Sequence, residues 1–279
     1  MDNIYILMIA ALAILAIADL VVGVSNDAVN FLNSAIGSKA VSFKTIMIVA
    51  SLGVAFGALS SSGMMEVARK GIFMPSEFYF NEIMIIFMAV MITDILLLDF
   101  FNTLGMPTST TVSIVFELLG AAVIMSLIKI STSDSQTIAD LGQYINTAKA
   151  TEIILGILLS VVVAFSIGAF VQYNTRLLLT FNFEQKAKWV SALFGGIAAT
   201  AITYFILIKG LKGASFVSGD FKLFISENAM IIVALSFIFW TALCSLITAV
   251  FKMSVYKFII IIGTFAIAMA FAGNDLVNF

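Results

Sequence analysis

The chain carries the same short polar motif twice, and this motif contains the residue types best able to bind an ion. Residues 26–31 read NDAVNF and residues 274–279 read NDLVNF, so the copies agree at five of six positions. On a helix the two asparagines of a copy share one face, and the aspartate lies beside them. Oxygen atoms of this kind suit Na⁺ or another hard cation. The two copies comprise Asn26, Asp27, Asn30, Asn274, Asp275 and Asn278.

Each copy follows a long apolar run, which places its aspartate in or near a membrane. An ionised carboxylate is costly inside a bilayer, and such groups usually mark ion or substrate pathways. The alternative for the first copy is a loop at the membrane interface with ordinary polar residues. The second copy weakens that alternative, because a chance match would have to repeat three polar residues that are rare within membranes.

A second polar cluster is rich in hydroxyl groups. Residues 107–113 read PTSTTVS, which places five hydroxyls in seven residues. Gly105 and Pro107 should break a helix just before this run, so a new helix should begin within it. A helix N-terminus binds anions through its free N–H groups and partial positive charge. The alternative is a plain N-cap, but a cap needs one hydroxyl and this segment has several.

The two clusters together predict symport of an anion with cations. An anion held beside two aspartates needs positive charge, and the charge-free windows of the chain supply no lysine or arginine. Cations must therefore enter with the anion. Phosphate near neutral pH carries P–O–H donors for carboxylates, whereas sulfate has none. This favours phosphate, with a sulfate or other oxyanion permease as the alternative.

The elements that must position these residues are membrane helices. Hydrophobic residues make up 62% of the chain and charged residues 11%, which is far from a soluble globular composition. The fold class is therefore an all-α polytopic membrane protein. Residues 83–104 and 111–128 form two apolar arms, which are either two full spans or a re-entrant hairpin. The other spans are predicted at about 4–24, 45–65, 150–173, 189–208, 229–251 and 258–273.

The distribution of lysine and arginine predicts that the two motif copies have opposite orientations. The positive-inside rule places residues 174–188 and 252–257 in the cytoplasm and 130–147 outside. The helix before the first motif then runs inward and the helix before the second runs outward. Inverted repeats are common in secondary transporters, with the site near mid-membrane. We expect a first repeat at 1–130, an extracellular loop and connecting helices at 131–257, and the start of a second repeat at 258–279.

The segments GVSNDAVNF…SAIGSKA, GMPTSTT and GNDLVNF resemble motifs of the inorganic phosphate transporter (PiT) family of cation-coupled symporters. The chain looks like the N-terminal part of such a protein, with the second repeat truncated after Phe279. The resemblance implies coupling-cation contacts at Asp27, Asn30, Asp275 and Asn278. It implies phosphate contacts at Asn26, Asp27, Ser109, Thr110, Thr111, Asn274 and Asp275.

The chain also departs from the family pattern. Val112 stands where the family usually has histidine, and Val54 stands where a glutamate is expected. Glu117 is either a proton site or a buried polar contact. These departures leave Na⁺ and H⁺ both open as the coupling ion. Additional carboxylates within the predicted membrane segments are Asp19, Asp94, Asp99 and Glu117.

Other functional classes fit the sequence less well. The chain has no histidine and one cysteine, Cys244, which lies inside a predicted span and should pack as a small apolar residue. An enzyme in the bilayer would need a metal cluster or an activated nucleophile, so we expect no enzyme, no cofactor and no metal beyond Na⁺. A non-transporting membrane scaffold would leave the repeated motif unexplained. The sequence has no basic arm of the kind that would indicate a nucleic-acid partner. We expect a multi-pass protein of the plasma (inner) membrane whose partners are phosphate and lipid, with a homo-oligomer left open.

Overall fold

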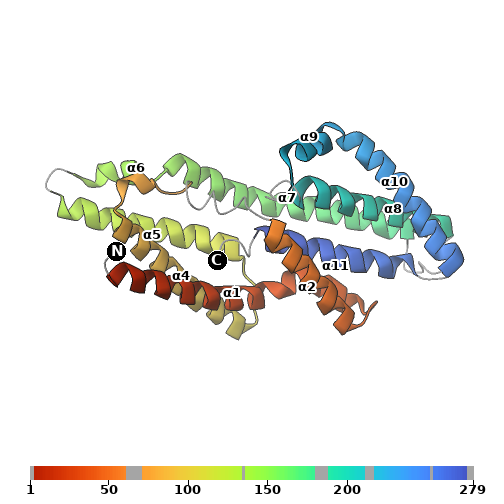
Figure 1. Cartoon of the computed structure of the whole chain (residues 1–279), viewed down its shortest axis with the longest axis horizontal. Helices are drawn as coiled ribbons and strands as arrows, with labels where there is room; N and C mark the ends of the chain where they lie inside the picture. Colours follow the sequence, from red (N-terminus) through yellow and green to blue (C-terminus); the bar gives the residue numbers. More distant parts are fainter. Residues whose placement is uncertain are drawn as a thin grey trace. The chain divides into compact units, whose positions relative to one another are not determined.

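The computed structural model describes residues 3–60, 71–133, 136–179, 188–210, 217–251 and 254–274. These residues form helices joined by turns (Figure 1), with one isolated antiparallel bridge between Phe73 and Ile145. The α-helices are α1 (Asn3–Ser38), α2 (Phe43–Ser60), α4 (Phe80–Leu104), α5 (Thr110–Thr132), α6 (Leu141–Tyr144), α7 (Thr147–Leu179), α8 (Lys188–Tyr204), α9 (Gly219–Glu227), α10 (Ala229–Leu246) and α11 (Val255–Asn274). Shorter helical turns are η1 (Pro75–Glu77), η2 (Ile138–Asp140), η4 (Phe205–Gly210) and η5 (Ile247–Phe251).

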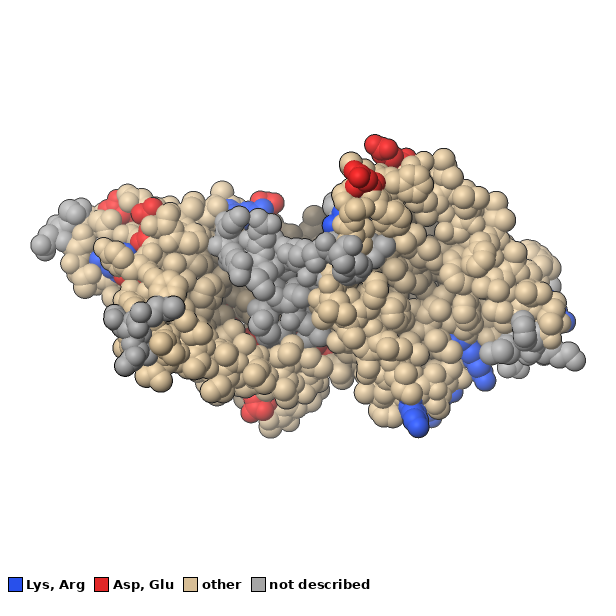
Figure 2. Space-filling view, in the orientation of Figure 1, with Lys and Arg blue, Asp and Glu red and all other residues tan. Residues whose placement is uncertain are grey.

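Eight of the described helices are long and apolar enough to cross a membrane. They correspond to the six predicted spans and the two predicted arms, so the prediction of a multi-pass, all-helical membrane protein is confirmed. Large apolar side chains are exposed along α7, including Leu158, Val162 and Phe165. Most of the surface in Figure 2 carries neither acidic nor basic side chains. Such a surface suits lipid, which is as apolar as these side chains.

Two helices extend well beyond their predicted bounds. The first was predicted at about 4–24, but α1 has 36 residues and continues to Ser38. The first NDAVNF copy therefore lies inside a helix, and the alternative of an interfacial loop is wrong for this copy. The other is α7, which has 33 residues. At 1.5 Å per residue, each is well above the length that about 30 Å of hydrocarbon requires.

The chain divides into two compact units that interleave along the sequence. Unit 1 comprises Met1–Asn30, Gly63–Leu159 and Asn274–Phe279, and unit 2 comprises Phe31–Ser62 and Ser160–Gly273. Unit 1 holds most of the first repeat predicted from the sequence, including α4, α5 and most of α1.

The core of unit 1 is built on the α4–α5 hairpin (Figure 1). Both helices bury residues at spacings of three or four, which places one stripe of each helix against its neighbours. The stripe of α4 contains Ile86, Val90, Asp94 and Leu98. The stripe of α5 contains Thr110, Ser113, Ile114, Leu118, Ala122, Ser126 and Ile130. Most of the polar core positions thus lie in the part of the hairpin nearer its tip, and apart from Ser126 the rest are apolar.

The predicted helix break between the two arms is confirmed. The first arm, α4, ends at Leu104, and Gly105 caps it with φ 69°. The N–H groups of Gly105 and Met106 donate to the carbonyl oxygens of Asn102 (3.0 Å) and Phe101 (3.0 Å). Glycine reaches this left-handed conformation without strain. The chain then turns through Pro107, and α5 begins at Thr110.

The open end of the hairpin is held by Lys129 near the end of α5. Its Nζ lies 2.9 Å from the Glu82 carboxylate of α4 and donates to the Glu77 carbonyl oxygen at 2.9 Å. The ammonium group also lies 4.5 Å from the centre of the Tyr79 ring, a favourable cation–π arrangement. Both ends of the hairpin are therefore fixed by specific polar contacts.

Unit 2 uses small residues to bring helices close together. Gly195 of α8 lies against Cys244 of α10, and a side chain at Gly195 would collide with the cysteine sulfur. Gly53 of α2 approaches the backbone of α11 in the same way. Cys244 is fully buried between Ala192 and Val255. The prediction that Cys244 is a small apolar packing residue is confirmed.

Candidate functional site

The first motif lies against the hairpin tip within unit 1, and Asn26 makes the contacts. Its Nδ2 donates to Asn102 Oδ1 (2.9 Å) and to the Met106 carbonyl oxygen (3.3 Å). Its Oδ1 accepts a hydrogen bond from the backbone N–H of Thr108 at 2.8 Å. Asn102 in turn donates to the Val22 carbonyl oxygen of α1 at 3.2 Å. Asn26 is 3% exposed, so its amide holds the tip from a buried position.

Asp27 connects the same motif to the first residue of α5. Its Oδ2 accepts a hydrogen bond from the Thr110 hydroxyl at 2.9 Å. Its Oδ1 accepts from Asn30 Nδ2 at 3.2 Å. Asp27 and Thr110 are each 1% exposed, whereas the Asn30 side chain is exposed. A buried carboxylate therefore sits beside a helix N-terminus, where the helix dipole favours negative charge.

The hydroxyl run lies at the start of α5. Ser109 is the N-cap, and its Oγ accepts a hydrogen bond from the Val112 N–H at 3.4 Å. The capping alternative is thus confirmed for Ser109. Thr110 uses its hydroxyl on Asp27 instead, and Thr111 is partly buried. Three consecutive hydroxyl residues therefore surround one helix N-terminus, with the carboxylate of Asp27 beside them.

The second copy of the motif cannot be placed beside the first. The backbone of Asn274 ends α11, but its side chain and all of residues 275–279 lie outside the described residues. The predicted roles of Asn274, Asp275 and Asn278 stay predictions.

The residues near the end of α4 divide into two groups. Asn102 belongs to the group of hydrogen bonds that ties Asn26 to the hairpin tip, which we call the clamp. Asp99 and Thr103 are exposed. One feature of the sequence could have identified Asn102 as a site residue. It lies three residues before the glycine that ends the helix, which places it beside the turn.

A cluster of carboxyl groups also lies in unit 1. The sequence showed each of these carboxylates within an apolar segment, but it did not show that they lie together. Ser113 Oγ lies 2.6 Å from Asp94 Oδ1 and 2.8 Å from Glu117 Oε1. The side chain of Asp19 contacts that of Asp94. Asp19 is 2% exposed and Asp94 is fully buried. The spacing of Ser113 and Glu117 on α5 indicates a shared helix face, but no pattern in the sequence shows that Asp19 packs against it.

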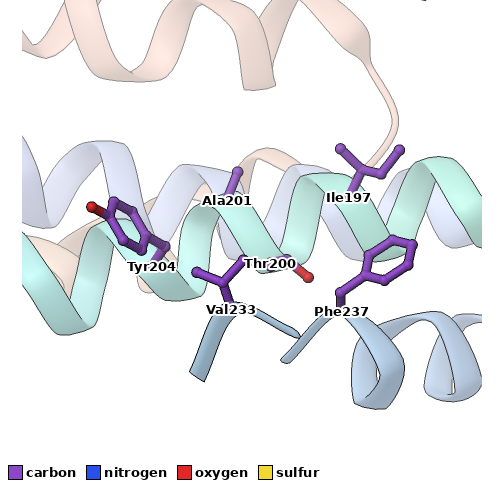
Figure 3. Close-up of a pocket in the computed structure, with 6 residues that line it drawn as sticks. All are labelled: Ile197, Thr200, Ala201, Tyr204, Val233 and Phe237. Carbon is purple, nitrogen blue, oxygen red and sulfur yellow. The ribbon is translucent and has the colours of Figure 1, made fainter. Parts of the chain in front are cut away.

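The apolar hollow in unit 2 has a different character. Its volume is about 480 Å³, and Figure 3 shows its lining on α8 and α10. The Thr200 hydroxyl there donates to the Gly196 carbonyl oxygen of its own helix at 2.7 Å. The lining has no charged side chain and offers little to an ion. It comprises Ile197, Thr200, Ala201, Tyr204, Val233 and Phe237.

Comparison with known proteins gives consistent results. Residues 23–279 match the model of the "Phosphate transporter family". A protein of Pyrococcus abyssi named "Putative phosphate permease" is 24% identical over 258 residues, which cover 91% of this chain and 60% of the relative. One of the same description from Thermococcus kodakarensis is 25% identical over 262 residues, again covering 91% and 60%. The chain thus spans about 60% of the length of these curated relatives.

A solved structure has the same fold. The protein described as "The sodium-dependent phosphate transporter" aligns with a TM-score of 0.70 at 18% sequence identity. The alignment covers 96% of this chain and 65% of that protein. At this level of identity the likeness shows the fold.

Proposed function

The chain belongs to the phosphate transporter family, and we propose that it carries inorganic phosphate across the membrane together with a cation. The observation that carries this proposal is the docking of the α5 N-terminus onto Asn26 and Asp27 of α1. It combines a helix N-terminus, a run of hydroxyls and a buried carboxylate in one place.

Phosphate would bind at the hairpin tip. The α5 N-terminus presents backbone N–H groups and a partial positive charge, both of which favour an anion. Ser109 and Thr111 add hydroxyls that can donate to phosphate oxygens, and the Thr110 hydroxyl, which donates to Asp27, can accept from a P–O–H group. The amide of Asn26 is engaged with the tip, and we assign it the task of fixing the backbone at Thr108. In the full site Asn274 and Asp275 would supply the corresponding groups of the second motif.

The carboxylate of Asp27 makes the site selective for an anion that carries hydrogen. A fully ionised oxyanion would leave Asp27 facing like charge in a buried site, which is costly. Phosphate retains one or two P–O–H groups near neutral pH, and these can donate to the carboxylate. Sulfate offers no such donor. This contrast supports phosphate over the alternative of a sulfate or other oxyanion permease.

A cation would compensate the negative charge of anion and carboxylate. The sequence of α1 and α4 contains no lysine or arginine, so these helices supply no positive charge to balance Asp27 and a bound anion. Asp27 and Asn30 share a hydrogen bond at 3.2 Å and offer oxygen atoms at one point of α1. We assign the coupling cation to this pair, with Asp275 and Asn278 as its partners from the second motif. The solved structure of the same fold is that of a transporter described as sodium-dependent, which favours Na⁺ over H⁺ at this position.

Competition between oxyanions tests the proposed substrate. Uptake of radiolabelled phosphate into liposomes that contain the full-length protein should persist in an excess of sulfate. The Thr110→Val variant should lose most of this uptake, because it removes the hydroxyl that donates a hydrogen bond to Asp27. Thr132→Val removes an exposed hydroxyl that bonds only within its own helix, at the opposite end of α5, and should behave as wild type. Equal inhibition by sulfate and unlabelled phosphate would reject phosphate specificity.

A further inference from the structure

We propose that Asp19, Asp94 and Glu117 together form a proton-binding site inside the membrane domain, separate from the motif site at the hairpin tip. The proposal extends the proposed function, since it gives the transporter a second ion site of its own. The residues come from three different helices, α1, α4 and α5, which also carry the clamp around the tip.

The geometry around Ser113 requires a hydrogen that the serine cannot supply. Its Oγ lies within hydrogen-bond distance of Asp94 Oδ1 (2.6 Å) and Glu117 Oε1 (2.8 Å). A hydroxyl has one hydrogen to donate, so it can donate to only one of the two carboxyl groups. The other contact needs a hydrogen on the carboxyl oxygen. At least one of these two side chains must therefore hold a proton for both bonds to form.

Further oxygen atoms of the cluster also lack donors. One oxygen of each carboxyl group is buried without a hydrogen-bond partner, namely Asp19 Oδ1, Asp94 Oδ2 and Glu117 Oε2. Asp19 and Asp94 contact each other, and two carboxyl groups can bond only with a proton between them. Buried polar atoms in native structures are normally satisfied. These oxygens therefore point to a proton shared within the group.

The three helices that carry the cluster offer no free basic side chain to compensate its charge. Along α1, α4 and α5 the only basic residue is Lys129, and it is bound to Glu82 at the far end of the hairpin. The other acidic residues on these helices bond to other groups or are exposed. Asp27 accepts from Thr110, and Asp99 is exposed. Two buried carboxyl groups and a half-buried third, without a basic partner on these helices, cannot all be ionised at acceptable cost.

A proton fits this cluster better than a metal ion. Among the described residues, no three acidic, histidine or cysteine side chains converge closely enough to hold a metal. A proton needs only two oxygen atoms within hydrogen-bond distance of each other. The three carboxyl groups and Ser113 provide several such pairs.

The position of the cluster connects it to the hairpin tip. Asp19 precedes Asn26 by seven residues on α1, which places both on one helix face. Asp94 lies eight residues before Asn102 on α4, and Ser113 is three residues after Thr110 on α5. Loading or release of the proton would change the packing of the same three helix segments that hold the proposed phosphate site.

Infrared difference spectroscopy of the purified full-length protein tests the site without any transport. A protonated carboxyl group has a carbonyl band that an ionised one lacks. The wild type should show this band at neutral pH, with a shift in D₂O. Glu117→Gln or Asp94→Asn should lose or displace the band, and Ser113→Ala should shift it, because the hydrogen-bond partner is removed. Asp99→Asn, which changes an exposed carboxyl on α4, should leave the band unchanged.

Two results would overturn the proposal. Absence of the band in folded wild-type protein would show that the cluster holds no proton at neutral pH. Loss of the band on addition of Na⁺ at constant pH would make the cluster a sodium site instead. Because no phosphate is needed, failure of the proposed transport function would leave this result standing, and the two ideas fail separately.

Discussion

Asp27 is the residue on which the candidate site depends most. It is buried, and it accepts hydrogen bonds from both Thr110 of α5 and Asn30 of its own helix. Asp27→Asn keeps the shape but removes the charge that attracts the cation and orients the P–O–H group. Since hydrogen bonds to charged groups contribute about 1.5–3 kcal/mol, we expect phosphate uptake to fall by about ten- to a hundredfold. The protein should still insert at wild-type levels.

The same assay on Asp99→Asn provides the control for Asp27→Asn. Asp99 is also acidic and lies close to the hairpin tip in sequence, but its side chain is exposed. Uptake by this variant should match the wild type. Equal uptake by both variants would remove Asp27 from the site.

Asn26 has a structural task that is separable from ion binding. Asn26→Ala deletes three hydrogen bonds to the hairpin tip and leaves the part-buried Thr108 N–H without its acceptor. A buried group left unsatisfied costs about 1–3 kcal/mol, and a part-buried one costs less, so the midpoint of thermal unfolding in detergent should fall. Asn30→Ala removes one bond from an exposed side chain and should change the midpoint far less. A similar loss in both variants would contradict the clamp.

At the scale of elements, the turn between α4 and α5 determines where the hydroxyl run lies. Gly105 has φ 69° and open space around the position of a Cβ atom, so an alanine there would suffer from backbone strain alone. The left-handed conformation costs an L-residue about 1–2 kcal/mol. Gly105→Ala should therefore lower both thermal stability and phosphate uptake.

Gly120 on α5 is a matched control for the turn. It has equally open surroundings but lies inside a helix, where alanine is favoured over glycine by about 1 kcal/mol. Gly120→Ala should be neutral or stabilising. If the two variants changed stability in the same direction, the turn would not depend on the conformation of Gly105.

At the scale of the whole molecule, the proposed cation coupling is motivated by the lack of lysine and arginine along α1 and α4. Phosphate uptake into liposomes should be faster with an inward Na⁺ gradient, an inward H⁺ gradient, or both, than with neither. Asn30→Ala should weaken the response to Na⁺. Glu117→Gln should weaken the response to pH, because it removes one carboxyl of the proton cluster. Uptake that ignores both gradients would contradict symport.

The membrane helices and the break between the arms could be predicted from the sequence because they depend on local properties. Charge-free runs indicate the helices, and Gly105 and Pro107 indicate the break. The extension of α1 to Ser38 could not be predicted, because polar residues such as Asn26 and Asn30 suggested an end to the apolar helix. Packing against the hairpin satisfies Asn26 and allows the helix to continue.

Contacts between helices could not be predicted from the sequence, for a different reason. Periodicity shows which face of a helix is buried, but it does not show which helix covers that face. Asp19, Asp94 and Glu117 were each visible as carboxylates in apolar segments, yet only the three-helix packing of unit 1 brings them together. The clamp between Asn26 and Asn102 joins residues 76 positions apart and was hidden for the same reason.

The central claim, that phosphate binds at the start of α5, is tested most directly by thiol labelling at the helix N-cap. Ser109→Cys in a Cys244→Ala background puts a single thiol at this exposed position, and Ser131→Cys puts one at the opposite end of α5. Both should react with a small aqueous thiol reagent. We predict that phosphate slows the reaction at residue 109 and not at residue 131, and that sulfate slows neither. A labelling rate at residue 109 that is the same with and without saturating phosphate would contradict the claim.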